Sequence, residues 1–371
     1  MESKEKMSNI ELLKILAIFM VITSHFCVHG GYDNLNFINL NFNRYLVQIL
    51  RIGTIANHIF IIITGYFMIN KKIKVEKIVK LILEMFVYSI LIYFIFYILN
   101  IDNIRNSGVK TLIKNVLPIF WGNWFIIYYI ILYLLSPFLN FLLKSLSKEK
   151  TQHLIIILFL LLFCIPTFTR NAWAFTGHDL FIFDYIIGAY IKLYMNKIKK
   201  KINFYLFLSI ICYIFVTFLI LIIGMLLKNN IILGQISYVI SVNYSLFSII
   251  IAVLLFMSSL NWKIKENKYI NYFSSSILGI YLIHDNSLVR KYIWTTLWKN
   301  DLYINSCFFI FYLIAKVLLV FIVCFSIDKI RIKIFKKFNE KIEHKITDRI
   351  NKKYNNIKKI LMINKVSVKY L

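Results

Sequence analysis

The sequence has few of the residues that interrupt helices or build disulfide and metal frameworks. Its 371 residues include only 3 prolines, 11 glycines and 5 cysteines. The cysteines form neither a CxxC pair nor any metal-ligand spacing, and most lie within apolar runs: Cys27, Cys164, Cys212, Cys307 and Cys324. We therefore interpret them as small, buried hydrophobic residues and expect no metal site.

Acidic residues and arginines are also scarce. There are 17 acidic residues against 44 basic ones, of which only 7 are arginine, and the formal net charge is +27. Such a charge suggests nucleic-acid binding, but the chain has neither a motif nor a globular domain for it. Because lysine, isoleucine and asparagine are abundant throughout, we attribute the charge to compositional bias and to the basic loops that orient membrane proteins. We expect no nucleic-acid partner.

Long apolar runs dominate the sequence. Hydrophobic residues make up 60% of it, aromatic residues 17%, and the mean hydropathy is +0.71. Short lysine-rich loops separate runs of about twenty residues, the length of a membrane-spanning helix. The runs do not alternate apolar and polar residues, as barrel strands would. The sequence therefore predicts an all-α polytopic integral membrane protein.

Hydropathy predicts about ten spans, an even number that places both termini on one side. Basic residues are about twice as frequent in the inner segments if the N-terminus is cytoplasmic, so we expect both termini there. We divide the chain into a ten-span membrane domain (1–327) and a basic tail (328–371), which is amphipathic or flexible and would lie on anionic lipid. The expected spans are 10–29, 46–69, 78–99, 122–143, 153–169, 180–195, 203–227, 237–260, 271–289 and 303–327.

The first apolar run, residues 9–25, carries three ionisable side chains. Lys14 and His25 are eleven residues apart, so a helix places them on one stripe, roughly 16 Å apart along its axis. Glu11, three residues before Lys14, faces the same side. A polar stripe in a spanning helix faces protein or water. His25 is thus a candidate general base, although a histidine bonded to a neighbouring carbonyl would look the same.

This segment resembles the opening helix of the membrane-bound acyltransferase family 3. That family's pattern is a basic residue, ten further residues and a histidine, with an acidic residue three places before the basic one. Here these are Lys14, His25 and Glu11, and the resemblance implies that all three belong to the catalytic site. The family more often has arginine first, and lysine lacks its bidentate fork. Four further stretches resemble the family in the same order, so that agreement covers most of residues 8–326: 57–69, 124–140, 184–194 and 274–286.

The resemblance implies transfer of an acyl group, usually acetyl, from coenzyme A to a hydroxyl of a sugar or glycan. The donor is cytoplasmic and polyanionic, and the inner basic cluster Lys71, Lys72 and Lys74 suits its phosphates, although topology alone also explains that cluster. His25 would deprotonate the acceptor or carry the acyl group, and the sequence leaves both open. We expect acyl-CoA as a substrate, no bound cofactor, and membrane lipid around the chain.

Other polar residues have two interpretations each. His284, at a depth similar to that of His25, is a candidate second catalytic or acceptor-orienting group. His58 either lines a cavity or packs with a hydrogen bond, and Asp184 pairs with a basic group or orients a histidine. Gly65 and Tyr66 indicate helix packing. The outer tryptophans suit sugar stacking, but the membrane interface also favours tryptophan: Trp121, Trp124, Trp173, Trp294 and Trp298.

Two other functional classes compete with this interpretation. A transporter or flippase of sugar-containing substrates would spread its charges over helices interrupted by glycine and proline, whereas the clearest polar stripe here is in the first helix. A sensor or scaffold would not need Lys14 and His25 on one face. Together with the resemblance, which implies the activity, these arguments lead us to expect a plasma-membrane O-acetyltransferase that acts on a cell-surface polysaccharide or its lipid-linked precursor.

Overall fold

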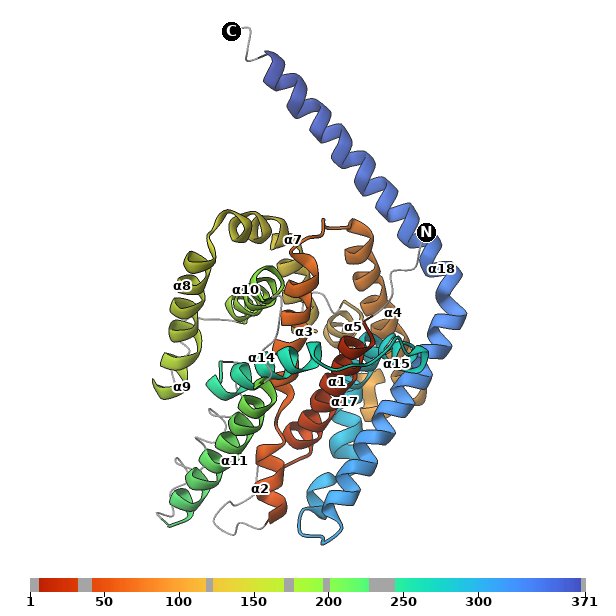
Figure 1. Ribbon diagram of the computed structural model, residues 1–371. Coiled ribbons are helices and arrows are strands. Elements are labelled where there is room, and N and C mark those ends of the chain that lie inside the picture. The colour runs from red at the N-terminus through yellow and green to blue at the C-terminus, as the bar shows by residue number, and fades with distance from the viewer. Residues whose placement is uncertain are drawn as a thin grey trace. The chain divides into compact units, whose positions relative to one another are not determined.

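The computed structural model describes residues 7–32, 42–117, 123–169, 177–195, 201–226 and 244–367, which form helices and no strand (Figure 1). This agrees with the predicted all-α class. Within these residues, seven helices are long and apolar enough to cross a membrane. The number of ten spans and the side of each terminus stay predictions.

The chain divides into two compact units, Met1–Lys72 with Asn123–Ser326, and Ile73–Gly122 with Ile327–Leu371. The helices of the first unit are α1 (Ser8–His29), α2 (Phe42–Ile49), α3 (Gly53–Met68), α7 (Trp124–Ser145), α8 (Lys148–Phe159), the π-turn η3 (Leu160–Cys164), α9 (Ile165–Thr169), α10 (His178–Tyr194), α11 (Ile202–Leu226), α14 (Leu246–Leu260), α15 (Lys268–Ser274), α16 (Ile277–His284), α17 (Ser287–Lys291), the π-turn η4 (Tyr292–Leu297) and the 3-10 turn η5 (Asn300–Tyr303). The second unit holds α4 (Val75–Leu99), the 3-10 turn η2 (Ile101–Asn106) and α5 (Gly108–Val116), and α18 (Phe309–Ser367) belongs to both units.

Helix α1 is the element against which α3, α14, α15 and α16 pack. Its buried residues recur every three or four positions, at Ile10, Leu13, Ala17, Val21 and Ser24. This spacing makes one continuous face of a helix, and that face is the one the neighbouring helices cover.

Two contacts fix the directions of the helices beside α1. The Asn9 side chain donates to the carbonyl of Ser259 (2.9 Å), so the start of α1 meets the end of α14. Gly53, the first residue of α3, lies against the Ser24 side chain near the end of α1. Helices α3 and α14 therefore run antiparallel to α1. Consequently the end of α3 lies at the N-terminal end of α1.

Helices α3 and α10 touch backbone to backbone at two glycines. A Cβ on Gly65 would overlap the backbone of Tyr185, and one on Gly188 would overlap the backbone of Ile62. Small residues allow such close approach of membrane helices. The predicted packing role of Gly65 beside a large neighbour is confirmed.

We expect Gly188→Ala to destabilise the protein although alanine favours helices. The added methyl group must separate α3 from α10, and overpacking of this kind costs about 1–3 kcal/mol. Unfolding of the purified protein in mild detergent measures the change. Ile157→Ala, which trims an exposed side chain on α8, is the control and should change stability by no more than about 0.5 kcal/mol. Equal stability of the two variants would contradict the close contact.

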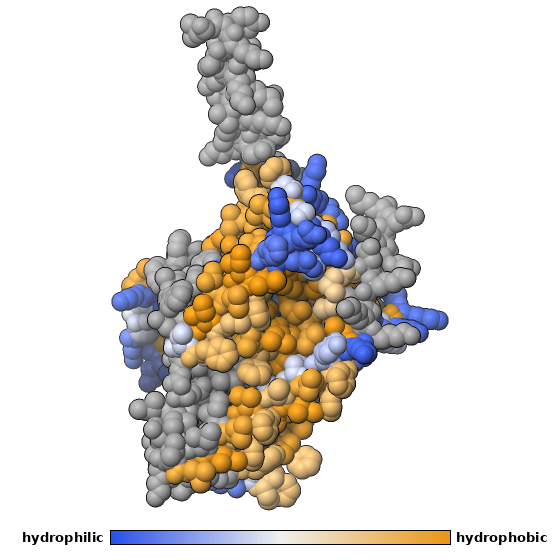
Figure 2. Space-filling model, turned by 60° about the vertical axis from the view of Figure 1, so that its left-hand side comes forward, coloured by the Kyte–Doolittle hydropathy of each residue, from blue (hydrophilic) through white to orange (hydrophobic). Residues whose placement is uncertain are grey.

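Hydrophobic residues cover much of the described surface that is visible in Figure 2. On α11, Phe204, Phe207 and Phe215 are each more than half exposed. Apolar surface of this extent suits contact with lipid chains. The same exposure corrects the interpretation of the cysteines, because Cys212 on α11 and Cys307 before α18 are exposed rather than buried.

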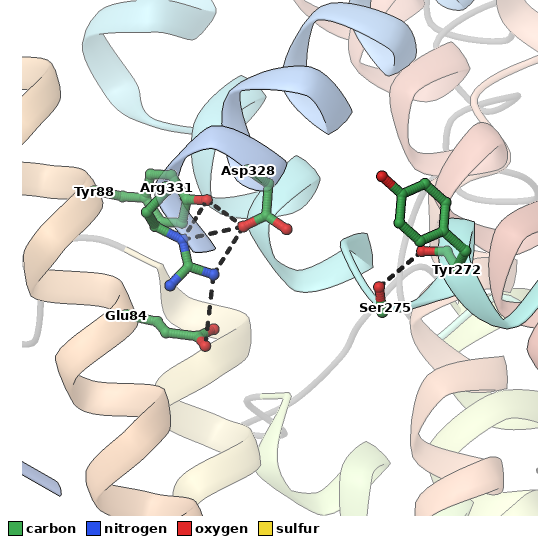
Figure 3. Close-up of polar contacts among 6 residues, drawn as sticks. All are labelled: Glu84, Tyr88, Tyr272, Ser275, Asp328 and Arg331. Atoms are coloured by element: carbon green, nitrogen blue, oxygen red, sulfur yellow. Dashed lines mark hydrogen bonds and ion pairs between the residues drawn. The ribbon is translucent and has the colours of Figure 1, made fainter. Parts of the chain in front are cut away.

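Residues 271–289, predicted as one span, do not form one continuous helix. They form parts of α15, α16 and α17, separated by turns. At the first break, the Ser275 hydroxyl donates to the carbonyl of Tyr272 (2.7 Å; Figure 3). At the second, Asn286 Oδ1 accepts from the backbone N–H two residues later (3.0 Å). Such side chains compete with the helical backbone bonds. The break leaves His284 at the end of α16.

Helix α18 differs from the predicted last span at both of its ends. It begins at Phe309 rather than residue 303, and the candidate membrane span within it runs to Phe335. The helix then continues unbroken to Ser367, so the described residues of the predicted tail are helical. A lipid-surface location for this tail stays a prediction.

In the second unit, a buried cluster of charged side chains joins α4 to α18 (Figure 3). Arg331 donates to Asp328 Oδ1 through Nε (3.1 Å) and Nη2 (2.8 Å), and Glu84 Oε1 lies 3.6 Å from Nη2. The Tyr88 hydroxyl donates to Asp328 and accepts from Arg331 Nε (2.9 Å). Charges inside a spanning segment persist when they are paired in this way.

Candidate functional site

Helices α1 and α16 bring two histidines together at the C-terminal end of α1. His25 Nδ1 lies 3.1 Å from His284 Nε2, and the ring centres are 5.1 Å apart. His284 is fully buried, whereas the His25 side chain keeps 19% of its surface exposed. Two residues that the sequence placed at a similar depth thus form one site.

The hydrogen bonds fix which nitrogen of each ring carries the proton. His284 Nδ1 lies 2.6 Å from the carbonyl oxygen of Ile280, which can only accept, so Nδ1 is the protonated nitrogen. In the neutral ring, Nε2 of His284 is then an acceptor, and His25 Nδ1–H donates to it. The other nitrogen of His25, Nε2, keeps its lone pair. Within the described part of the chain it has no hydrogen-bond partner.

An acidic and a basic residue also lie beside His25. Asp285 Oδ1 lies 3.6 Å from His25 Nδ1 and 2.9 Å from Arg290 Nη1. The Asp285 side chain is 6% exposed and that of Arg290 35%. A carboxylate beside Nδ1–H stabilises the imidazolium that forms when Nε2 takes a proton. Arg290 holds that carboxylate in place through a charge-assisted bond.

Sequence reasoning gave Asp285 and Arg290 no role in the site. The available signal was an acidic residue directly after His284 and a basic residue five positions later. The turn at Asn286, which ends one helix and begins the next, folds Arg290 back to Asp285. An unbroken helix over this stretch, as predicted, does not bring positions five apart onto one face.

The other two predicted catalytic residues lie at the opposite end of α1. Lys14 Nζ contacts Glu11 Oε1 at 2.7 Å, which confirms that the two share one side of the helix. Their side chains are 28% and 15% exposed. Helix α1 is unbroken between Lys14 and His25, so roughly 16 Å separates them along the axis. The structure therefore joins Lys14 to Glu11 and not to His25.

The predicted donor-binding lysines follow the end of α3. Lys71, Lys72 and Lys74 are all exposed, and Lys71 Nζ lies 5.2 Å from the centre of the Phe67 ring. Lys71 and Lys72 belong to the first unit and Lys74 to the second. Because α3 runs antiparallel to α1, Lys71 and Lys72 lie at the N-terminal end of α1, away from His25.

A histidine–carboxylate pair is buried between α3 and α10. His58 Nδ1 lies 2.8 Å from Asp184 Oδ2, and their side chains are 3% and 1% exposed. The His58 ring also packs edge-on against Phe163 in η3 (5.7 Å). Of the alternatives left open, the structure supports a packed, hydrogen-bonded His58 and an Asp184 that orients a histidine.

The outer tryptophans divide into packed and partly exposed residues. Trp294 is fully buried and packs edge-on against Phe26 (5.7 Å). Trp298, 5.3 Å from Trp294, is partly exposed, and Trp124 packs against Phe181 (6.3 Å). Two of the tryptophans lie outside the described residues: Trp121 and Trp173.

A family model matches most of the chain. It is described as an acyltransferase domain, and it covers residues 7–327 of the 371. No curated protein and no solved structure gives a match. The matched residues include His25, His284, Asp285 and Arg290.

Proposed function

This chain belongs to the membrane acyltransferase family 3, and from that premise we propose that it is an O-acetyltransferase of the plasma membrane. It transfers an acetyl group from acetyl-CoA to a hydroxyl of a cell-surface polysaccharide or its lipid-linked precursor. The observation that carries the proposal is the contact of His25 Nδ1 with His284 Nε2 at 3.1 Å, from which we infer that His25 Nε2 keeps its lone pair.

The positions of the protons on the His25 and His284 rings suit general-base catalysis. His25 Nε2 takes the proton of the acceptor hydroxyl as its oxygen attacks the thioester carbon. The C–S bond then breaks, and the coenzyme A thiolate takes the proton back from Nε2. In the other route, Nε2 attacks the thioester carbon, the C–S bond breaks and the coenzyme A thiolate leaves. The acetyl group then passes from Nε2 to the acceptor oxygen, whose proton goes to the thiolate. Both routes need a basic Nε2 and a positive charge on the ring, which Asp285 stabilises.

The donor approaches from the N-terminal end of α1. Its phosphates meet the exposed Lys71, Lys72 and Lys74, which follow one another along the chain. Glu11 and Lys14 form a neutral pair on the helix between this end and His25. Lysine lacks the planar guanidinium with which arginine binds an anion through two parallel hydrogen bonds. Lys14 therefore serves in this pair as part of a polar surface along the thioester arm of the donor, not as a phosphate-binding residue.

Purified full-length protein in lipid nanodiscs tests the proposal. It should release coenzyme A from labelled acetyl-CoA and acetylate an alkyl hexoside in equal amounts. Without an acceptor, a burst of one coenzyme A and one labelled protein per enzyme supports the acyl-carrier route, and its absence supports the general-base route. Movement of a lipid-linked sugar across proteoliposomes without acetyl-CoA, with no acetylation, would favour the transporter instead.

Asp285→Asn should lower kcat on the order of 100-fold, the scale of one electrostatic term in a transition state. The amide keeps the shape of the side chain but cannot stabilise a charged His25 ring, so KM should change little. Asp285→Glu should recover part of the rate. The control is Asp301→Asn, an exposed carboxylate in η5. If KM rises while kcat is unchanged, Asp285 does not act through the charge on His25.

A further inference from the structure

Lys316 is a cation inside the apolar part of α18. It is the eighth residue of the helix, within the segment Phe309–Phe335 that is apolar enough to cross a membrane. Among the described residues no carboxylate lies within 4 Å of its ammonium. Instead Nζ lies 4.4 Å from the centre of the Trp298 ring and 5.2 Å from that of Tyr312. Charges inside a span are costly and usually mark function, and cation–π contacts offset part of the cost.

The aromatic rings under Lys316 are held in place by one another and by hydrogen bonds. Tyr303 stacks on Tyr312 with ring centres 4.4 Å apart and 17° between the planes. The Tyr312 hydroxyl donates to Asn300 Oδ1 (2.7 Å) and lies 3.3 Å from the carbonyl of Trp298. The rings therefore form a fixed platform, and Lys316 and Trp298 are both partly exposed on it.

Two buried N–H groups beside the platform need an acceptor. Trp294 Nε1 and Asn300 Nδ2 are buried, and neither has a hydrogen-bond partner among the described residues. Because Asn300 Oδ1 already accepts from Tyr312, its amide N–H groups remain as donors. Buried donors without acceptors are rare in folded proteins. An ammonium and two N–H groups are all hydrogen-bond donors, so they suit a ligand that offers oxygen acceptors, preferably charged ones.

This cluster lies next to the catalytic base. Phe26, the residue after His25, packs against Trp294 (5.7 Å) and Tyr312 (6.1 Å). Arg290, which binds Asp285, is four residues before Trp294 on the continuous run of α17 and η4. The cluster is thus at the C-terminal end of α1, opposite the end with Lys71 and Lys72. That is the end at which the proposed reaction receives its acceptor.

We propose that Lys316, Trp298 and Tyr312, with the N–H groups of Trp294 and Asn300, form an acceptor subsite for a saccharide that bears an oxyanion. The assignment rests on the proposed acetyl transfer. The aromatic rings pack against the apolar face of the sugar, and Lys316 pairs with the oxyanion. The oxyanion is a phosphate of a lipid-linked saccharide or a carboxylate of the sugar itself.

The test compares three acceptors with the same alkyl chain: a neutral hexoside, a hexuronide and a hexosyl pyrophosphate. Full-length protein in nanodiscs transfers acetyl from acetyl-CoA to each of them. Lys316→Met should lower kcat/KM at least tenfold for an anionic acceptor and leave the neutral one unchanged. The anionic acceptor whose kcat/KM falls more in Lys316→Met identifies the source of the oxyanion. Lys316→Arg keeps the charge and should keep the preference, as should Lys291→Met, which removes an exposed lysine of α17.

If Lys316→Met lowers kcat/KM equally for all three acceptors, or for none of them, the subsite is refuted. The proposed acetyl transfer is not refuted by either result. If the wild-type protein acetylates none of the three, the proposed function fails instead. Calorimetric binding of the hexuronide and the hexosyl pyrophosphate then tests the subsite alone. Binding of either one weakened tenfold by Lys316→Met supports the subsite, whereas binding of neither, or unweakened binding, refutes it.

Discussion

His25→Ala should reduce acetyl transfer by about 10²–10⁴-fold, the usual contribution of a positioned general base. His284 cannot replace it at the same place, because His284 Nδ1 is bound to the Ile280 carbonyl and its Nε2 faces His25. The measurements are coenzyme A release by protein in nanodiscs and O-acetylation of surface glycans in cells that carry each variant. Lys14→Ala, at the other end of α1, should impair donor use rather than the chemical step.

His25→Asn separates the chemistry from the packing. The asparagine amide can still donate to His284, but it supplies no base. This variant should fold as the wild type does and remain inactive. His153→Ala, which removes an exposed histidine on α8, is the matched control and should retain full activity. Wild-type rates in a correctly inserted His25→Asn protein would falsify the assignment of His25 as base or acyl carrier.

Arg331→Met should cost about 3–5 kcal/mol of stability, as expected when one partner of a buried ion pair is removed. Glu84 and Asp328 would then remain buried in a spanning segment without their cation. Unfolding of the purified protein, followed by loss of helical circular dichroism, measures the difference. The hydrogen bond from Tyr88 to Asp328 does not compensate, because a phenol carries no positive charge.

Neutral replacements distinguish charge from packing in this cluster. The triple variant Glu84→Gln, Asp328→Asn and Arg331→Met removes all three charges and should recover most of the stability that the single variant loses. Lys333→Met, which removes an exposed lysine two residues along α18, should have little effect. If Arg331→Met is as stable as the wild type, the cluster does not hold α4 to α18.

The sequence predicted the features that depend on neighbouring positions. Helix α1, the Glu11–Lys14 pair and the packing at Gly65 all follow from helical periodicity or from small side chains beside large ones. The similar depth of His25 and His284 also followed from their places within two spans. Their contact could not be predicted, because it joins residues 259 positions apart and depends on how the two helices pack.

Asp285, Arg290 and Lys316 were missed because hydropathy and helical periodicity do not predict the turns and contacts that give these residues their partners. A continuous apolar run around His284 indicated one long helix, but Ser275 and Asn286 interrupt it, and the second turn brings Arg290 to Asp285. Lys316 was counted as part of an apolar run, because only the folded chain places Trp298 beside it. Hydropathy detects a spanning segment but not the partner of a single charge within it.

The distance along the chain between His25 and its partners bears on how this protein is made. At about 5–20 residues per second, a ribosome needs roughly 13 to 50 s to travel from His25 to His284. During that time α1 is in the bilayer without the carbonyl that Asn9 binds and without either partner of His25. The Glu11–Lys14 pair, by contrast, is complete within the newly made helix. Nascent chains that end before α16 therefore hold an inserted first helix and no assembled site.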